Sequence, residues 1–213
     1  MNSKDNIKNS YTFQYILVGD SAVGKTKIAY RFKNNEFSNS YSVTLNAEFT
    51  NKVIQVDGEN IKINLGDIAG DEKFRGIMTT YYKKSICILF VYDITIIETF
   101  NNIKNWIDEV SRAVNNEKIF VLVGNKSDLE ENRKVKTDDA QEFAEKNNML
   151  FYETSALNGN NIQELFNQTA KKILDNIRQN KYFLADDDCG IIAEKSSLDI
   201  KNDEDKSCSC KIF

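Results

Sequence analysis

The chain has 213 residues, of which 41% are hydrophobic and 28% are charged, enough apolar sequence for one domain with a sizeable core. Its formal net charge is only -4 and it contains no histidine, which excludes a global basic field for nucleic acid and any catalysis by imidazole. Residues 1–10 lack the apolar core of a secretory signal, and the longest apolar runs fall far short of the roughly 20 residues of a membrane helix, so we expect a cytosolic protein.

Short β-rich runs alternate with segments of helical periodicity, a pattern typical of an α/β fold with a mostly parallel sheet. Asp57-Gly58, between two of these runs, is a strong signal for a tight antiparallel hairpin. The expected architecture is therefore a six-stranded mixed sheet with one antiparallel strand, flanked by helices. The predicted strands are Phe13–Val18, Ala47–Val56, Ile61–Leu65, Ile86–Tyr92, Ile119–Val123 and Leu150–Tyr152.

Apolar residues at three- and four-residue steps predict helices over Phe100–Val110 and Ile162–Ile177. Thr137-Asp138-Asp139 is typical of the capped, acidic start of a further helix. The side chains that this helix should turn inward are Ala140, Phe143 and Ala144.

Helical periodicity stops near Asn180. Residues 181–213 hold five lysines against eight Asp or Glu residues in a polar stretch, which is typical of a flexible tail. We therefore predict a flexible N-terminus at 1–10, one folded domain at 11–180 and a flexible tail at 181–213. Cys87 lies in an apolar run and is expected in the core, whereas Cys189 lies in an acidic stretch.

The segment that follows the apolar run Tyr15–Val18 matches the phosphate-binding loop pattern GxxxxGK[ST]. In such a loop, backbone N–H groups and a helix N-terminus face phosphate oxygens, Lys25 adds positive charge near the β and γ phosphates, and the Thr26 hydroxyl can ligate Mg²⁺. The alternative is a tight strand-to-helix turn with an exposed lysine. The loop comprises Gly19, Asp20, Ser21, Ala22, Val23, Gly24, Lys25 and Thr26.

Two further motifs follow later predicted strands and point to guanine. Asn125-Lys126-Ser127-Asp128 places Asp128 where its carboxylate can accept from guanine N1–H and N2–H₂, while Lys126 lies along the base. In Glu153-Thr154-Ser155-Ala156, a backbone N–H can meet the guanine carbonyl. Each motif alone is compatible with a polar loop. Their order with the phosphate loop favours a guanine-nucleotide site, and Asp128 opposes an enzyme that uses ATP.

With these motifs, the chain resembles the Rab family of Ras-superfamily small GTPases over roughly residues 11–178. Similar stretches are GDSAVGKT at 19–26, Tyr81-Tyr82, VYDIT at 91–95, GNKSDL at 124–129 and ETSAL at 153–157. The last of these and Tyr11-Thr12-Phe13 are similar to the Rab branch of recycling endosomes and the Golgi. The resemblance implies a P-loop small G domain that binds GTP or GDP with Mg²⁺.

The resemblance also assigns roles residue by residue. Phe37 would pack on the guanine edge, the alternative being a buried loop aromatic. Thr44 would touch Mg²⁺ and the γ-phosphate only in the GTP state, or else simply enter a strand. Asp67 would hold Mg²⁺, mostly through water, and the Gly70 N–H would sense the γ-phosphate, whose loss frees both switch loops. The loop of Ser155, Ala156 and Leu157 would adjoin the guanine.

The chain departs from the family at two positions that matter for function. Asp71 stands where the family has a catalytic glutamine, whose amide both donates and accepts to orient water. The catalytic set implied is then Asp71, Lys25 and Gly70, with slow intrinsic hydrolysis. Gly66 replaces the tryptophan of an aromatic triad in which Phe49 and Tyr81 remain. We therefore expect atypical effectors.

The C-terminus resembles a prenylation signal, with Cys208 and Cys210 as lipidation sites and Phe213 favouring a geranylgeranyl group. The alternative is a pair of exposed thiols. Since the tail is acidic, stable anchoring should need two lipid chains, or one chain and a protein receptor.

The resemblance implies a monomeric GTP/GDP switch in vesicle trafficking. It would cycle between the cytosol and the cytoplasmic face of an intracellular membrane, at the Golgi, the recycling endosome or a related organelle. The implied partners are effector proteins, an exchange factor, a GTPase-activating protein and a GDP-dissociation inhibitor. A GTP-retaining, hydrolysis-poor membrane scaffold that recruits effectors remains the alternative.

Overall fold

The computed structural model describes residues 10–38, 48–68, 75–114, 117–182 and 188–193. Thr44, Gly70, Asp71, Cys208 and Cys210 lie outside the described residues. In the described part, no helix combines the length and apolar character needed to cross a bilayer.

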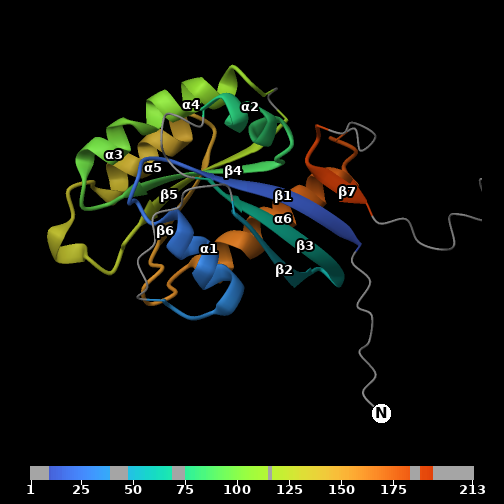
Figure 1. Cartoon of the computed structure of the whole chain (residues 1–213), viewed down its shortest axis with the longest axis horizontal. Coiled ribbons are helices and arrows are strands. Elements are labelled where there is room, and N and C mark those ends of the chain that lie inside the picture. Colours follow the sequence, from blue (N-terminus) through green and yellow to red (C-terminus); the bar gives the residue numbers. More distant parts are fainter. Residues whose placement is uncertain (1–9, 39–47, 69–74, 115–116, 183–187, 194–213) are drawn as a thin grey trace, which may run out of the picture.

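The strands form one mixed sheet in the order β2-β3-β1-β4-β5-β6, and β7 pairs with β1 (Figure 1). The pairs β1–β3, β1–β4, β4–β5 and β5–β6 are parallel, and β2–β3 is antiparallel. The strands are β1 Tyr11–Val18, β2 Glu48–Val56, β3 Glu59–Asp67, β4 Cys87–Asp93, β5 Ile119–Asn125, β6 Leu150–Thr154 and β7 Ile191–Ala193.

The six predicted strands and their hairpin are confirmed. Asp57 and Gly58 connect β2 to β3 with φ angles of 50° and 84°, the left-handed pair that a tight hairpin turn requires. Four strands extend beyond their predicted ends, and each has a polar residue at its last position. These residues are Asp67, Asp93, Asn125 and Thr154.

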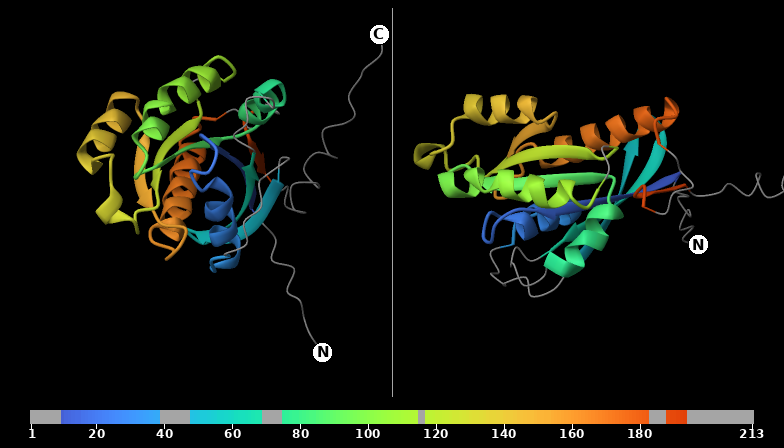
Figure 2. Two further views of the ribbon diagram at one scale, coloured as in Figure 1. Left: turned by 60° about the vertical axis from the view of Figure 1, so that its left-hand side comes forward. Right: turned by 90° about the horizontal axis from the view of Figure 1, so that it is seen from above.

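Helices cover both faces of the sheet (Figures 1 and 2). The sheet separates two hydrophobic cores, and side chains of β1 alternate between them. Phe13, Tyr15 and Leu17 pack in the core that contains α1 and α6. Ile16 and Val18 pack in the core that contains α2, α4 and α5. Cys87 is fully buried in the core of α1 and α6, as predicted. The helices are α1 Lys25–Asn34, α2 Arg75–Lys83, α3 Ile97–Asn101, α4 Ile103–Ser111, α5 Thr137–Lys146 and α6 Ile162–Arg178.

Two helix predictions need correction. The segment Phe100–Val110 is not one helix, because α3 ends at Asn101 and α4 begins at Ile103. The side chain of Thr137 does not cap α5, since Lys136 occupies the cap position and the Thr137 hydroxyl donates to the Glu153 carboxylate instead. The inward face of α5 is as predicted, with Ala140 and Ala144 buried and Phe143 packed against the same core.

The segment at 188–193 was predicted to belong to a flexible tail, and this is wrong. Its strand β7 pairs antiparallel with Tyr11–Phe13, the part of β1 that precedes the first β4 pair at Tyr15. The Gln14 N–H donates to the Gly190 carbonyl over 2.9 Å, and Cys189 is buried. The sheet therefore gains a seventh strand, which is too short to produce a periodic signal in the sequence.

Candidate functional site

The phosphate loop lies between β1 and α1, and its shape depends on two glycines. Gly19 has a φ of 143°, and a Cβ atom there would lie 2.2 Å from the Val91 carbonyl oxygen. Gly24, next to the first residue of α1, has a φ of 101°, and a Cβ there would lie 2.2 Å from Asn125 Nδ2. Because L side chains rarely adopt these angles and both contacts are too close, glycine is required at both positions.

Lys25 is buried at the start of α1, with 7% of its surface exposed. Its ammonium donates to the carbonyls of Gly19 at 2.8 Å and Asp20 at 2.7 Å, inside the loop itself. Burial lowers the pKa of Lys25 to about 8, and the neighbouring Asp67 and Asp20 carboxylates act in the opposite direction. Lys25 therefore places a positive charge where water solvates it poorly, and such a position favours the binding of an anion.

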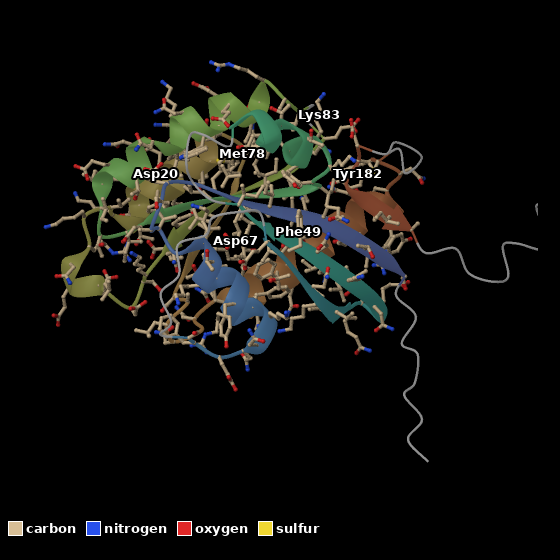
Figure 3. The ribbon with its side chains drawn as sticks, in the orientation of Figure 1. Asp20, Phe49, Asp67, Met78, Lys83 and Tyr182 are labelled. Atoms are coloured by element: carbon tan, nitrogen blue, oxygen red, sulfur yellow. The ribbon has the colours of Figure 1, made fainter. Side chains whose placement is uncertain are left out.

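Asp67 is the last residue of β3 (Figure 3). It lies near Lys25 and is only 3% exposed. Within the described residues, neither oxygen of its carboxylate has a hydrogen-bond partner. Burial raises the pKa of Asp67, while the nearby Thr26 hydroxyl and Lys25 ammonium act to lower it. A buried carboxylate next to a hydroxyl is an oxygen donor set that suits Mg²⁺. The two predicted metal residues that the structure describes are thus brought together.

Asn125 joins the phosphate loop to the loop after β6. Its Nδ2 donates to the Val23 carbonyl over 2.9 Å, and its Oδ1 accepts from the Thr154 hydroxyl at 3.3 Å and the Ala156 N–H at 3.4 Å. The residue is 1% exposed. Its amide therefore holds together two loops that the sequence motifs assign to phosphate and to base.

Lys126 and Asp128 are each held by a neighbouring side chain. The Lys126 ammonium pairs with Asp93 Oδ2 at 2.5 Å, and Asp93 Oδ1 accepts from the backbone N–H and hydroxyl of Thr95. Asp128 Oδ1 accepts from the Ser155 hydroxyl. Each of the two side chains predicted to contact the base is therefore held in one orientation by a neighbour.

The Asp20 side chain is held by two residues of the α3–α4 region, Asn102 and Trp106. Its two carboxylate oxygens accept from Asn102 Nδ2 and Trp106 Nε1, both at 2.8 Å. Sequence reasoning missed Asn102 and Trp106 because they lie 82 and 86 residues from their partner. Asp20 therefore fixes the phosphate loop to the α3–α4 region, which leaves its backbone as the part of the residue suited to phosphate.

Phe37 follows α1 and is half-buried. The Lys27 ammonium lies 5.5 Å from the centre of its ring, within the distance of a cation–π contact. The ring therefore lies near the first turn of α1, next to the phosphate loop.

Comparison with known proteins agrees with this geometry. Residues 14–175 match the family model described as the Ras family. The chain belongs to the Ras family.

Three relatives place it among the Rab proteins of that family. Ras-related protein Rab-2B of Dictyostelium discoideum is 37% identical over 186 residues, covering 87% of this chain and 92% of the relative. Ras-related protein RABA4b of Arabidopsis thaliana is 39% identical over 172 residues, or 81% and 77% of the two chains. The GTP-binding protein YPT1 of Saccharomyces cerevisiae is 39% identical over 174 residues, or 82% and 84%. The chain is therefore a Rab-type small GTPase.

This Rab-family chain has an unusual aromatic surface on β2. Phe49 (Figure 3) lies on this strand. It is 48% exposed, and its ring centre lies 5.6 Å from that of Tyr81. Gly66 is the cross-strand partner of Phe49, and a Cβ atom there would lie 3.2 Å from the Phe49 ring. The Phe49 ring therefore packs against backbone at Gly66, the position where the family resemblance described above implies a tryptophan.

The support that Trp106 gives to the phosphate loop is testable by a double-mutant cycle. Trp106→Phe removes one donor to a partly buried carboxylate, so we expect it to lower the unfolding free energy by about 1–3 kcal/mol in denaturant titrations. In an Asp20→Ala background the same change should cost clearly less. An equal cost in both backgrounds would mean that packing of the indole matters, and not its hydrogen bond.

Proposed function

We propose that this GTPase binds GTP or GDP with Mg²⁺, hydrolyses GTP slowly, and switches between two states in vesicle trafficking. The main support is the carboxylate of Asp67, which is buried beside Lys25 and Thr26 at the end of the phosphate loop. A bound cation with phosphates would offset the cost of burying these groups.

Thr26 and Asp67 would hold the Mg²⁺, and Thr44 would join them in the GTP state. When bound, the ion would supply positive charge that offsets the negative charge of the nucleotide phosphates. Lys25, whose pKa of about 8 leaves it mostly protonated at pH 7, would add a second positive charge. Gly70 would contact the γ-phosphate through its N–H.

Guanine selectivity would come from Asp128, which can accept from both N1–H and N2–H₂ of the base. The Ser155 hydroxyl already donates to one of its oxygens, which holds the carboxylate in one orientation. Lys126 would lie along the base plane, Phe37 along its edge, and the N–H groups of the loop at 155–157 near its carbonyl.

Lipid groups on Cys208 and Cys210 would hold the protein on the cytoplasmic face of an intracellular membrane. Effectors would read the Phe49 and Tyr81 surface, where Gly66 removes the usual aromatic anchor. An exchange factor, a GTPase-activating protein and a GDP-dissociation inhibitor would complete the cycle of a monomeric switch.

Asp71 favours slow hydrolysis, because an ionised carboxylate can accept but cannot donate and brings negative charge towards the γ-phosphate. In single-turnover hydrolysis of preloaded GTP with Mg²⁺, we expect Asp71→Gln to react about tenfold faster than the native chain. Asp128→Ala serves as the binding control and should lose its preference for GTP over ATP.

A native rate equal to or above that of Asp71→Gln would mean that Asp71 positions water effectively. Multiple-turnover phosphate release separates the switch from its alternative, a GTP-retaining membrane scaffold. The scaffold requires phosphate release close to background in saturating GTP and Mg²⁺, in single as well as multiple turnover, so that slow nucleotide exchange cannot account for it.

A further inference from the structure

Arg31 makes an unusual set of contacts near the end of α1. Its guanidinium donates from Nε to the Ala156 carbonyl at 2.8 Å and from one terminal nitrogen to the Leu157 carbonyl. The other terminal nitrogen donates to the Asn35 carbonyl at 3.0 Å. One side chain thus links two segments more than 120 residues apart in the sequence.

The segment on one side is the loop after β6. The guanidinium binds two consecutive carbonyls there, and it also packs against Gly159, whose φ is 87° and whose Cβ would lie 3.7 Å from the Arg31 side chain. With two adjacent carbonyls held, the backbone from Ala156 to Asn158 has little freedom to turn. The Ala156 N–H, whose bond to Asn125 Oδ1 is long at 3.4 Å, belongs to this held backbone, and it is the donor that we expect to meet the guanine carbonyl.

The segment on the other side is the exit from α1. Asn35 caps the helix in a left-handed conformation with a φ of 56°, and its N–H donates to the Arg31 carbonyl over 2.9 Å. The Arg31 side chain returns to the Asn35 carbonyl, so this residue is held at both of its backbone groups. Phe37, two residues further on, is the aromatic expected at the edge of the base.

The geometry points to Arg31 as a positioning residue for guanine recognition, which sets the loop at 156–157 against α1 so that its backbone can read the 6-oxo group of the base. This inference rests on the proposed binding of guanine nucleotides. In this proposal the Arg31 guanidinium does not contact the nucleotide, and it affects binding only by positioning the loop at 156–157.

The planar fork of arginine is what makes these contacts possible. Three N–H donors in fixed directions reach three carbonyls, and bonds from a charged donor are stronger than neutral ones. A lysine ammonium in the same place is a single point on a flexible stem and cannot span all three acceptors. Ser155 has its own attachments, since its hydroxyl donates to Asp128 and its N–H donates to the Asn160 carbonyl. The carboxylate that reads the 2-amino group is therefore held without Arg31.

The test measures Kd values of the full-length chain for three diphosphates with Mg²⁺, with ADP as a further reference. The three are GDP, IDP, which lacks the 2-amino group, and 2-aminopurine riboside diphosphate, which lacks the 6-oxo group and the N1–H that goes with it. The missing N1–H weakens the contact with Asp128 equally in every variant, so the change on substituting Arg31 reports on the 6-oxo group. For Arg31→Met and Arg31→Lys, we expect the preference for GDP over the 2-aminopurine nucleotide to fall about tenfold. The preference for GDP over IDP should stay within about twofold of wild type. Lys33→Met, an exposed basic residue in the same helical turn, is the matched control.

Each other outcome is decisive. If all three nucleotides weaken equally in the Arg31 variants, Arg31 only stabilises the fold and the inference is wrong. The inference also fails if Arg31→Lys keeps the wild-type preferences, because a point charge would then suffice. Since Arg31→Lys keeps the charge and most of the stem, it provides the test even if Arg31→Met does not fold. A wild-type chain that does not prefer GDP to ADP would instead overturn the proposed function.

Discussion

Asp67→Asn is expected to stabilise the nucleotide-free protein and, at the same time, to weaken Mg²⁺-dependent binding of GDP about 100-fold. The folded protein raises the pKa of this carboxyl above its ordinary value of 3.8, chiefly because the group is buried. Ionised Asp67 therefore opposes folding, and a neutral side chain of the same shape should raise the unfolding free energy by about 1–3 kcal/mol. With Mg²⁺ and nucleotide bound, we expect aspartate to be favoured over asparagine instead, because a neutral amide oxygen is a poorer ligand for Mg²⁺ than a carboxylate.

The pH dependence follows from the direction of the same shift. Between pH 3.8 and the raised pKa, the folded protein keeps a proton that the unfolded chain has released. The contribution of Asp67 to the unfolding free energy therefore falls as pH rises through this window. The difference between wild type and Asp67→Asn should be small below about pH 4 and should grow above it.

Two measurements test this prediction. Denaturant unfolding of the nucleotide-free chain across this pH range gives the stability, and GDP binding at several Mg²⁺ concentrations gives the dependence on the metal. Asp108→Asn, which changes an exposed carboxylate on α4, is the control and should alter neither quantity. A less stable Asp67→Asn protein would mean that the carboxylate contributes to the fold as well as to the ligand. Equal Mg²⁺ dependence in the two proteins would remove Asp67 from the metal site.

The parts of this structure that could be predicted from the sequence are those that depend on local sequence patterns. Apolar runs located six strands, Asp57-Gly58 located the hairpin, and the phosphate-loop motif located the turn into α1. The two motifs predicted to bind the base could be recognised for a related reason, since both lie at the carboxyl ends of strands that are neighbours in the sheet.

The parts that were missed depend on contacts between distant residues. Nothing near Arg31 in the sequence indicates that it reaches Ala156, and nothing near Asp20 indicates Trp106. The break at Asn102 was missed because apolar spacing continues through it, while its side chain is engaged with the phosphate loop. Such pairings become visible only when the fold brings the partners together.

Gly190→Ala is expected to release β7 from the sheet. Gly190 has a φ of 78°, and a Cβ atom there would lie 2.3 Å from the Ile86 nitrogen and 2.6 Å from the Ser85 carbonyl carbon. Both neighbours are backbone atoms next to β4, so they cannot turn aside as a flexible side chain would. The segment that carries Gly190 must move instead, and Cys189 should become accessible.

The measurement is the rate at which Cys189 reacts with a thiol reagent, in a background with Cys208→Ser and Cys210→Ser. Cys189 is 7% exposed and Cys87 is fully buried, so Cys87 reports on global opening in the same sample. We expect Cys189 to react about 100-fold faster in Gly190→Ala, and Cys87 to change little, because the shift should be confined to one short strand.

Gly58→Ala is the matched control for this experiment, since Gly58 has a similar φ of 84° but no atom within 4 Å of its Cβ position. The left-handed backbone costs about the same at both sites, roughly 1–2 kcal/mol, so a difference between the two variants isolates the collision with β4. If both variants leave Cys189 protected, the close approach at Gly190 is not what holds the segment. If Cys189 reacts rapidly in the wild-type chain, the segment at 188–193 does not stay on β1 in solution, and the sheet has six strands as first predicted.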